Sequence, residues 1–144
     1  MTGQPWSVGW RAWVPAALWS AVIFLLSSIP GNAFPVLPGC WNADKFVHTA
    51  IYAVLGALCW FGARGTLPAR RGRVAQVTVA ALIAMLYGVT DEAHQAFTPM
   101  RTPDPFDVAA DALGGLLGAI ACVVIVSRKH VHSATAHGLD GVDG

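Results

Sequence analysis

The chain alternates between long apolar runs and short polar clusters, and this pattern predicts membrane-spanning helices. Asp, Glu, Lys and Arg are absent between Arg11 and Asp44, and also from residues 46–63, 74–90 and 112–127. A hydrocarbon core of about 30 Å needs about 20 helical residues to cross it. We therefore expect an all-α membrane protein, a four-transmembrane-helix bundle. The expected helices span about 12–28, 46–63, 73–92 and 106–127.

The composition supports a membrane protein and excludes two other classes. Of 144 residues, 55% are hydrophobic and only 12% are charged, and the mean hydropathy is +0.54. A soluble domain carries about a quarter charged residues, and a disordered chain needs low hydrophobicity with high charge. The net charge of +1 is too small to attract nucleic acid to the protein, so we expect no nucleic-acid partner. The high hydrophobic content indicates that the partner is the lipid bilayer. We expect one membrane domain, residues 1–129, and a disordered cytoplasmic tail, residues 130–144.

The distribution of cations predicts the orientation of the helices. Most of the nine Lys and Arg residues flank one side of the expected bundle, namely Arg11, Arg64, Arg70, Arg71, Arg73, Arg128 and Lys129. Cytoplasmic loops of membrane proteins carry such an excess of cations. We therefore expect both termini in the cytoplasm, with residues 29–45 and 93–105 outside the membrane.

Acidic residues gather at the opposite, outer ends of the helices. Outside the tail, the acidic residues are Asp44, Asp91, Glu92, Asp104, Asp107 and Asp111. The outer cations are Lys45 and Arg101. Polar side chains in lipid must face one another or a water-filled cavity. The sequence therefore predicts an outward-facing polar site.

Helical spacing places the polar residues on three stripes. The stripes are Lys45, His48 and Tyr52 on the second helix, Asp91, Glu92 and Gln95 on the third, and Asp104, Asp107 and Asp111 on the fourth. Together with Arg101, these residues are the candidates for ligand binding. The candidates for catalysis are His48, Asp91, Glu92 and Asp107.

Several of these residues also have structural interpretations. Asp104 before Pro105 is typical of a helix N-cap followed by proline at the first helical position. Lys45 could extend to the lipid headgroups, and His48 could be a hydrogen-bonded core residue. By contrast, Asp91 and Glu92 lie at a helix C-terminus, where the helix dipole disfavours negative charge. We therefore predict that one of them pairs with Arg101.

The motifs resemble those of the VanZ-like family, which is named for an accessory membrane protein of teicoplanin (glycopeptide) resistance. The resemblance covers about residues 12–126. It rests on Ser27-Ser28-Ile29-Pro30, Asp44-Lys45 with His48 and Tyr52, Asp91-Glu92-x-x-Gln95-x-Phe97-x-Pro99-x-Arg101, Asp104, Asp107 and the glycines 114, 115 and 118. Two positions depart from the family pattern: Met100 replaces an expected glycine, and Asp111 replaces a common asparagine. Gly114-x-x-x-Gly118 is also a helix-packing motif.

The resemblance implies a multi-pass protein of the bacterial plasma membrane that affects glycopeptide susceptibility. We expect the outer site to bind a cell-envelope component, either a lipid-linked precursor or an anionic headgroup. Lys45 and Arg101 would hold phosphate or carboxylate, and the acidic residues would accept hydroxyls and amines or hold a divalent cation. The alternatives are a metal- or His/carboxylate-dependent enzyme acting on a lipid headgroup and a small oligomeric ion-coupled transporter. No HExxH-like spacing in the sequence identifies a particular metal. The sequence also leaves open whether the protein forms a homo-oligomer.

Overall fold

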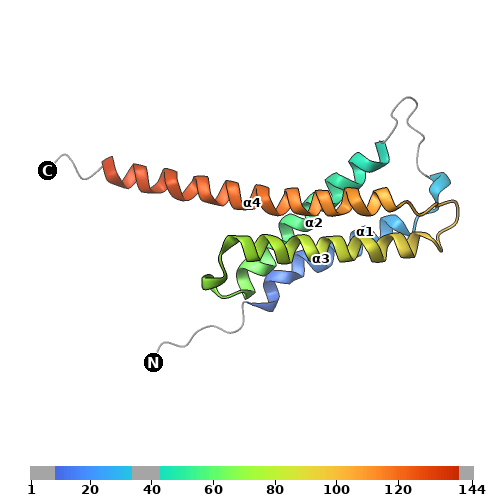
Figure 1. Cartoon of the computed structure of the whole chain (residues 1–144), viewed down its shortest axis with the longest axis horizontal. Coiled ribbons are helices and arrows are strands. Elements are labelled where there is room, and N and C mark those ends of the chain that lie inside the picture. Colours follow the sequence, from blue (N-terminus) through green and yellow to red (C-terminus); the bar gives the residue numbers. More distant parts are fainter. Residues whose placement is uncertain (1–8, 34–42, 140–144) are drawn as a thin grey trace.

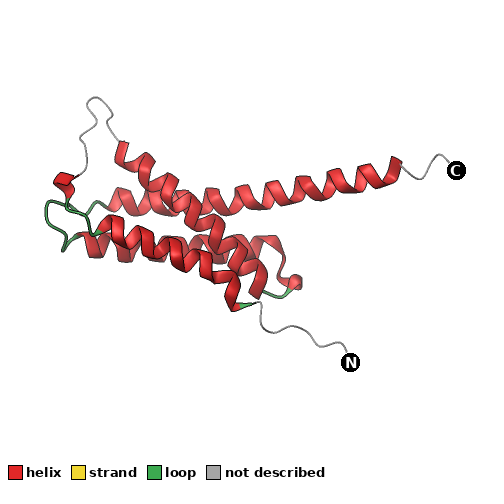
Figure 2. Cartoon of the chain, turned by 180° about the vertical axis from the view of Figure 1, so that it is seen from behind, coloured by secondary structure: helices red, strands yellow, loops and turns green. Residues whose placement is uncertain are grey.

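The structure is a computed structural model that describes residues 9–33 and 43–139, and within this part it is helical without β-strands (Figures 1 and 2). The main helices are α1 Val14–Ser27, α2 Ala43–Thr66, α3 Gly72–Gln95 and α4 Pro105–Leu139. Short 3₁₀ helices are η1 Trp10–Trp13, η2 Gly31–Ala33 and η3 Ala69–Arg71.

Each main helix contributes one segment that is long and apolar enough to cross a membrane. These segments are Trp10–Ser27, Asp44–Thr66, Gly72–Gln95 and Pro105–Arg128. At about 1.5 Å per residue they are roughly 27–36 Å long, which matches the hydrocarbon core. The predicted all-α architecture with four membrane spans is therefore confirmed.

The fourth helix is longer than the sequence predicted. α4 continues to Leu139 and projects beyond the other helices (Figure 1), whereas the sequence predicted a helix end at about residue 127 and a disordered tail from residue 130. Neither proline nor glycine occurs between Gly118 and Gly138, so nothing in the sequence interrupts the backbone hydrogen bonds of the helix. Residues 140–144 lie outside the described residues.

The bundle packs small residues inside and exposes large apolar ones. Ala63, Ala80, Ala84 and Ala119 are completely buried. The exposed large apolar residues are distributed over all four helices, for example Leu18, Leu25, Phe61, Val74, Leu86, Leu113 and Ile125. A soluble protein rarely exposes so much contiguous apolar surface, whereas lipid-facing helices require it.

Glycines bring α2 and α4 into direct backbone contact. A Cβ atom added at Gly56 would collide with the backbone of Gly115 on α4. In the same way, a Cβ at Gly114 would collide with the backbone of Thr49, and one at Gly118 with that of Ala53. The glycine motif of the fourth helix is therefore a packing motif, as small-residue motifs of membrane helices commonly are.

The start of η1, the α2–α3 connection and the projecting end of α4 lie at one end of the bundle, as Figure 1 shows, and the α3–α4 loop lies at the opposite end. The α3–α4 loop, the C-terminus of α1 and the N-terminus of α2 lie at the other end, which we call the loop end. The first and last described residues therefore lie at the same end of the bundle.

Candidate functional site

The polar stripes predicted from the sequence meet at the loop end. α2 contributes Lys45 and His48, α3 contributes Glu92, and the start of α4 contributes Asp104, Asp107 and Asp111. We call these six residues the polar cluster. Their side chains come from three helices, so the helix packing described above decides whether the cluster forms.

Lys45 joins α2 to the start of α4. Its ammonium donates hydrogen bonds to Asp104 Oδ2 at 2.6 Å and to Asp107 Oδ1 at 2.5 Å. A third hydrogen bond, of 3.1 Å, goes to the neighbouring Asp44. The three donors of the ammonium group are therefore all used by carboxylates of the protein.

Asp104 has the capping role that the sequence suggested and also belongs to the cluster. Its Oδ1 accepts the Phe106 N–H at 2.9 Å, while its Oδ2 accepts from Lys45. The hydrogen bond from Lys45, followed by that from Phe106, holds the pKa of the Asp104 carboxyl below its usual range. Asp104 is therefore charged at neutral pH.

His48 forms a second connection between α2 and α4, one turn deeper. Its Nδ1 lies 2.9 Å from Oδ1 of Asp111, which is completely buried. This places the imidazole between a carboxylate and the rest of the cluster. The second oxygen of Asp111, Oδ2, is buried and has no hydrogen-bond partner in the part of the chain that the structure describes.

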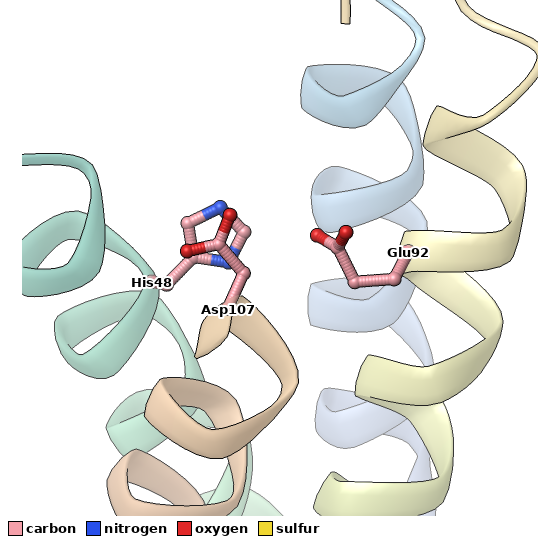
Figure 3. A group of neighbouring side chains, drawn as sticks. All are labelled: His48, Glu92 and Asp107. Carbon is pink, nitrogen blue, oxygen red and sulfur yellow. The ribbon is translucent and has the colours of Figure 1, made fainter. Parts of the chain in front are cut away.

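Glu92 approaches the cluster from α3. Its Oε2 accepts the Asp104 N–H at 2.8 Å, whereas Oε1 is buried and has no hydrogen-bond partner among the described residues. Figure 3 shows that Glu92 extends from its helix toward His48 and Asp107. One nitrogen or oxygen atom from each of these three side chains lies within 4.8 Å of the others.

The remaining predicted residues of the second and third helices lie beside the cluster. Asp91 and Gln95 are buried, and Gln95 Nε2 donates to Asp91 Oδ2 at 3.1 Å. Tyr52 is buried beneath His48, with the two rings parallel and their centroids 6.5 Å apart. The Tyr52 hydroxyl is buried close to the carboxyl groups of Asp91 and Asp111.

Side-chain exposure falls steadily from the surface of the cluster to its floor. It is 60% for Asp44, 36% for Asp104, 22% for Lys45, 10% for Asp107 and 0% for Asp111. The cluster is therefore open toward the loop end and closed within the bundle.

An apolar core follows below the floor of the cluster. Leu55, Cys59, Ala84 and Ala119 are buried there.

Arg101 is held by the end of α1 and not by Asp91 or Glu92. Its guanidinium donates to the carbonyl oxygens of Leu26 and Ile29, each at 3.4 Å. No salt bridge joins Arg101 to Asp91 or Glu92, all three of which are described residues, so the predicted ion pair is wrong. The reason is that Glu92 is buried in the bundle and accepts from the Asp104 N–H, whereas the Arg101 guanidinium donates to the carbonyls at the end of α1.

The contacts of Arg101 belong to a larger connection between α1 and the α3–α4 loop. Thr98 Oγ1 donates to the Ser27 carbonyl at 3.2 Å, and Gly31 N–H donates to the Pro99 carbonyl at 3.1 Å. Ser28 Oγ lies 3.0 Å from His94 Nε2. Helical periodicity does not predict this connection, although Ser27-Ser28-Ile29-Pro30 and Arg101 both belong to the family motifs.

The fold and the cluster together define a class of protein: a four-span membrane protein with a carboxylate-rich site buried at its loop end. The VanZ/LLP1 family model matches residues 8–126, which include all four spans almost completely. The chain therefore belongs to the VanZ/LLP1 family, as its motifs suggested. Comparisons with curated proteins and with solved structures find no match.

The backbone of Met100 explains why a glycine suits the position before Arg101. Met100 has φ of +60°, a left-handed conformation that costs an ordinary residue about 1–2 kcal/mol. Its side chain is 76% exposed and so loses little packing when removed. We expect Met100→Gly to raise the free energy of unfolding by about 0.5–1 kcal/mol, after the extra freedom of glycine in the unfolded chain is subtracted.

Reversible unfolding of the detergent-solubilised protein measures this change. Met100→Ala is the matched control, because it removes the side chain but keeps the strained Cβ. A glycine variant that is no more stable than the alanine variant would show that the left-handed conformation costs nothing.

Proposed function

We propose that the polar cluster binds the polar headgroup of a cell-envelope lipid in the outer leaflet of a bacterial plasma membrane. The observation that supports this proposal is a pair of buried carboxylate oxygens, Glu92 Oε1 and Asp111 Oδ2, that accept no hydrogen bond from the described residues. The cluster that contains them is open toward the loop end. A buried carboxylate oxygen without a partner is costly. A ligand that brings hydroxyl or amine donors, or a cation, removes this cost.

The contacts of the cluster narrow the chemistry of the ligand. The Lys45 ammonium donates to three carboxylates of the protein, so it is not an open phosphate-binding group in this conformation. The carboxylates Glu92, Asp107 and Asp111 are the groups that remain for a ligand. The headgroups of lipid-linked precursors, which combine sugar hydroxyls and amines with phosphate, have the donors that such a site needs. Through such a precursor the protein would affect glycopeptide susceptibility.

A second candidate function is catalysis on the same headgroup. The observation that favours it is the hydrogen bond between His48 Nδ1 and the buried Asp111, because a carboxylate that orients an imidazole is the usual support of a general base. Binding is the first proposal because no nucleophile lies among the described contacts of His48.

The proposal requires the loop end to face outward. In a background without the native cysteines, we expect a cysteine at Thr102, in the α3–α4 loop, to react with a membrane-impermeant maleimide in intact cells. A cysteine at Arg70, at the opposite end of the bundle, is the control and should react only after permeabilisation. The reverse pattern would place the cluster in the cytoplasm and contradict the proposal.

Lipid analysis of the purified protein tests the binding itself. The protein is extracted from bacterial membranes in mild detergent, and its bound lipids are compared with those of the whole membrane by mass spectrometry. We expect one lipid class to be enriched at least tenfold, and the enrichment to disappear in Glu92→Gln. Asp140→Asn, which also removes one negative charge but lies near the C-terminus, should leave the lipid enrichment unchanged. Bound lipid with the composition of the bulk membrane would exclude the proposed function.

A further inference from the structure

Three side chains in the polar cluster have the composition and placement of a metal site. A ring nitrogen of His48 and one carboxylate oxygen each from Glu92 and Asp107 lie within 4.8 Å of one another (Figure 3). They come from α2, α3 and α4, so a common ligand would hold all three helices together.

The carboxylate of Glu92 provides an independent indication of a ligand. Glu92 is only 6% exposed, and its Oε1 has no hydrogen-bond partner within the described residues. Its other oxygen is fixed by the Asp104 N–H, so the carboxylate is held in place rather than free to turn away. A positive ion at Oε1 would satisfy the oxygen that the protein leaves without a donor.

The environment of His48 matches that of a metal-binding histidine. Nδ1 lies 2.9 Å from the Asp111 carboxylate, and a neutral His48 that donates its Nδ1 proton to this carboxylate keeps the lone pair on Nε2. Metal-binding histidines almost always donate their other nitrogen to such a carboxylate, which fixes the ring and makes it a better ligand. Asp111 is therefore a positioning residue for His48.

We propose that His48, Glu92 and Asp107 bind a divalent cation that accepts nitrogen and oxygen ligands, Zn²⁺ or Mn²⁺. His48 coordinates through Nε2, and Asp107 coordinates through Oδ2 while Lys45 keeps its hydrogen bond to Oδ1. Ligand atoms around a bound zinc ion lie about 3.3 Å apart, so the three groups move closer by at most about 1.5 Å when the ion enters.

The cation also explains how a carboxylate-rich site could recognise a phosphate. Since the Lys45 ammonium is paired with carboxylates of the protein, a bound divalent ion would supply positive charge within the cluster for a phosphate of a lipid headgroup. This part of the inference rests on the proposed function, whereas the metal site itself does not.

Titration of the metal-stripped full-length protein tests the site without any added lipid. The protein carries no polyhistidine tag, and His130, His132 and His137 are replaced by Gln, because these histidines could chelate zinc themselves. By isothermal titration calorimetry we expect one Zn²⁺ or Mn²⁺ per chain. Glu92→Gln and His48→Ala should each weaken binding at least tenfold, and Asp111→Asn should weaken it about 10- to 100-fold.

His94→Ala is the matched control, because His94 is also a histidine at the loop end but bonds to Ser28 outside the cluster. It should bind the ion as the unchanged protein does. Absence of binding to the folded protein, or equal binding by the Glu92→Gln variant, would overturn the site.

Thermal unfolding keeps the test valid if a variant folds poorly. A saturating ion should raise the Tm of the unchanged protein and of the His94 variant, since an ion that binds only the folded state stabilises it. An unchanged Tm in the presence of the ion would also overturn the site.

Comparison with the lipid measurement separates the two proposals. Lipid enrichment that persists after complete removal of metal would support the proposed function and contradict the cation's role in it. Metal binding without lipid enrichment would support the site and contradict the proposed function.

Discussion

The close contact between α2 and α4 is the constraint on which the rest of the structure depends. Gly56, Gly114 and Gly118 let the two backbones touch, and any side chain at these positions would collide with the facing helix. Membrane helices lack a hydrophobic force that drives them together, so such close packing has to stabilise the pair. One consequence is that Lys45 reaches the start of α4, and another is that His48 reaches Asp111.

The third helix, α3, also reaches the site through close contacts at glycine residues. A Cβ added at Gly88 would meet the side chain of Asp111, and one at Gly115 would meet Ala84, so α3 also packs closely on α4. This contact brings Glu92 into the cluster. Negative charge then accumulates at the loop end beyond what Lys45 can neutralise, and the buried oxygens without donors are the result. A site built in this way is completed by a positive ion or by the donors of a ligand.

The helical stripes and the four spans could be predicted from the sequence, whereas the partners of individual residues could not. Periodicity shows that Lys45 and His48 share a face of one helix and that Asp107 and Asp111 share a face of another. It does not show which face meets which, and the ion pair expected for Arg101 failed because the loop before Pro105 directs that residue to the end of α1. The end of α4 was missed for a different reason, since charged and polar residues end a membrane span without ending a helix.

A double-mutant cycle between Lys45 and Asp107 tests most directly whether α2 and α4 are joined as described. Stability is measured for Lys45→Met, Asp107→Asn and the double variant, with a parallel cycle for Lys45 and the exposed Asp44. The account predicts a coupling free energy of about 1–3 kcal/mol for the buried pair, and less than about 1 kcal/mol for the exposed pair. A coupling near zero for Lys45 and Asp107 would contradict it, because the two helices would then not hold these charges together.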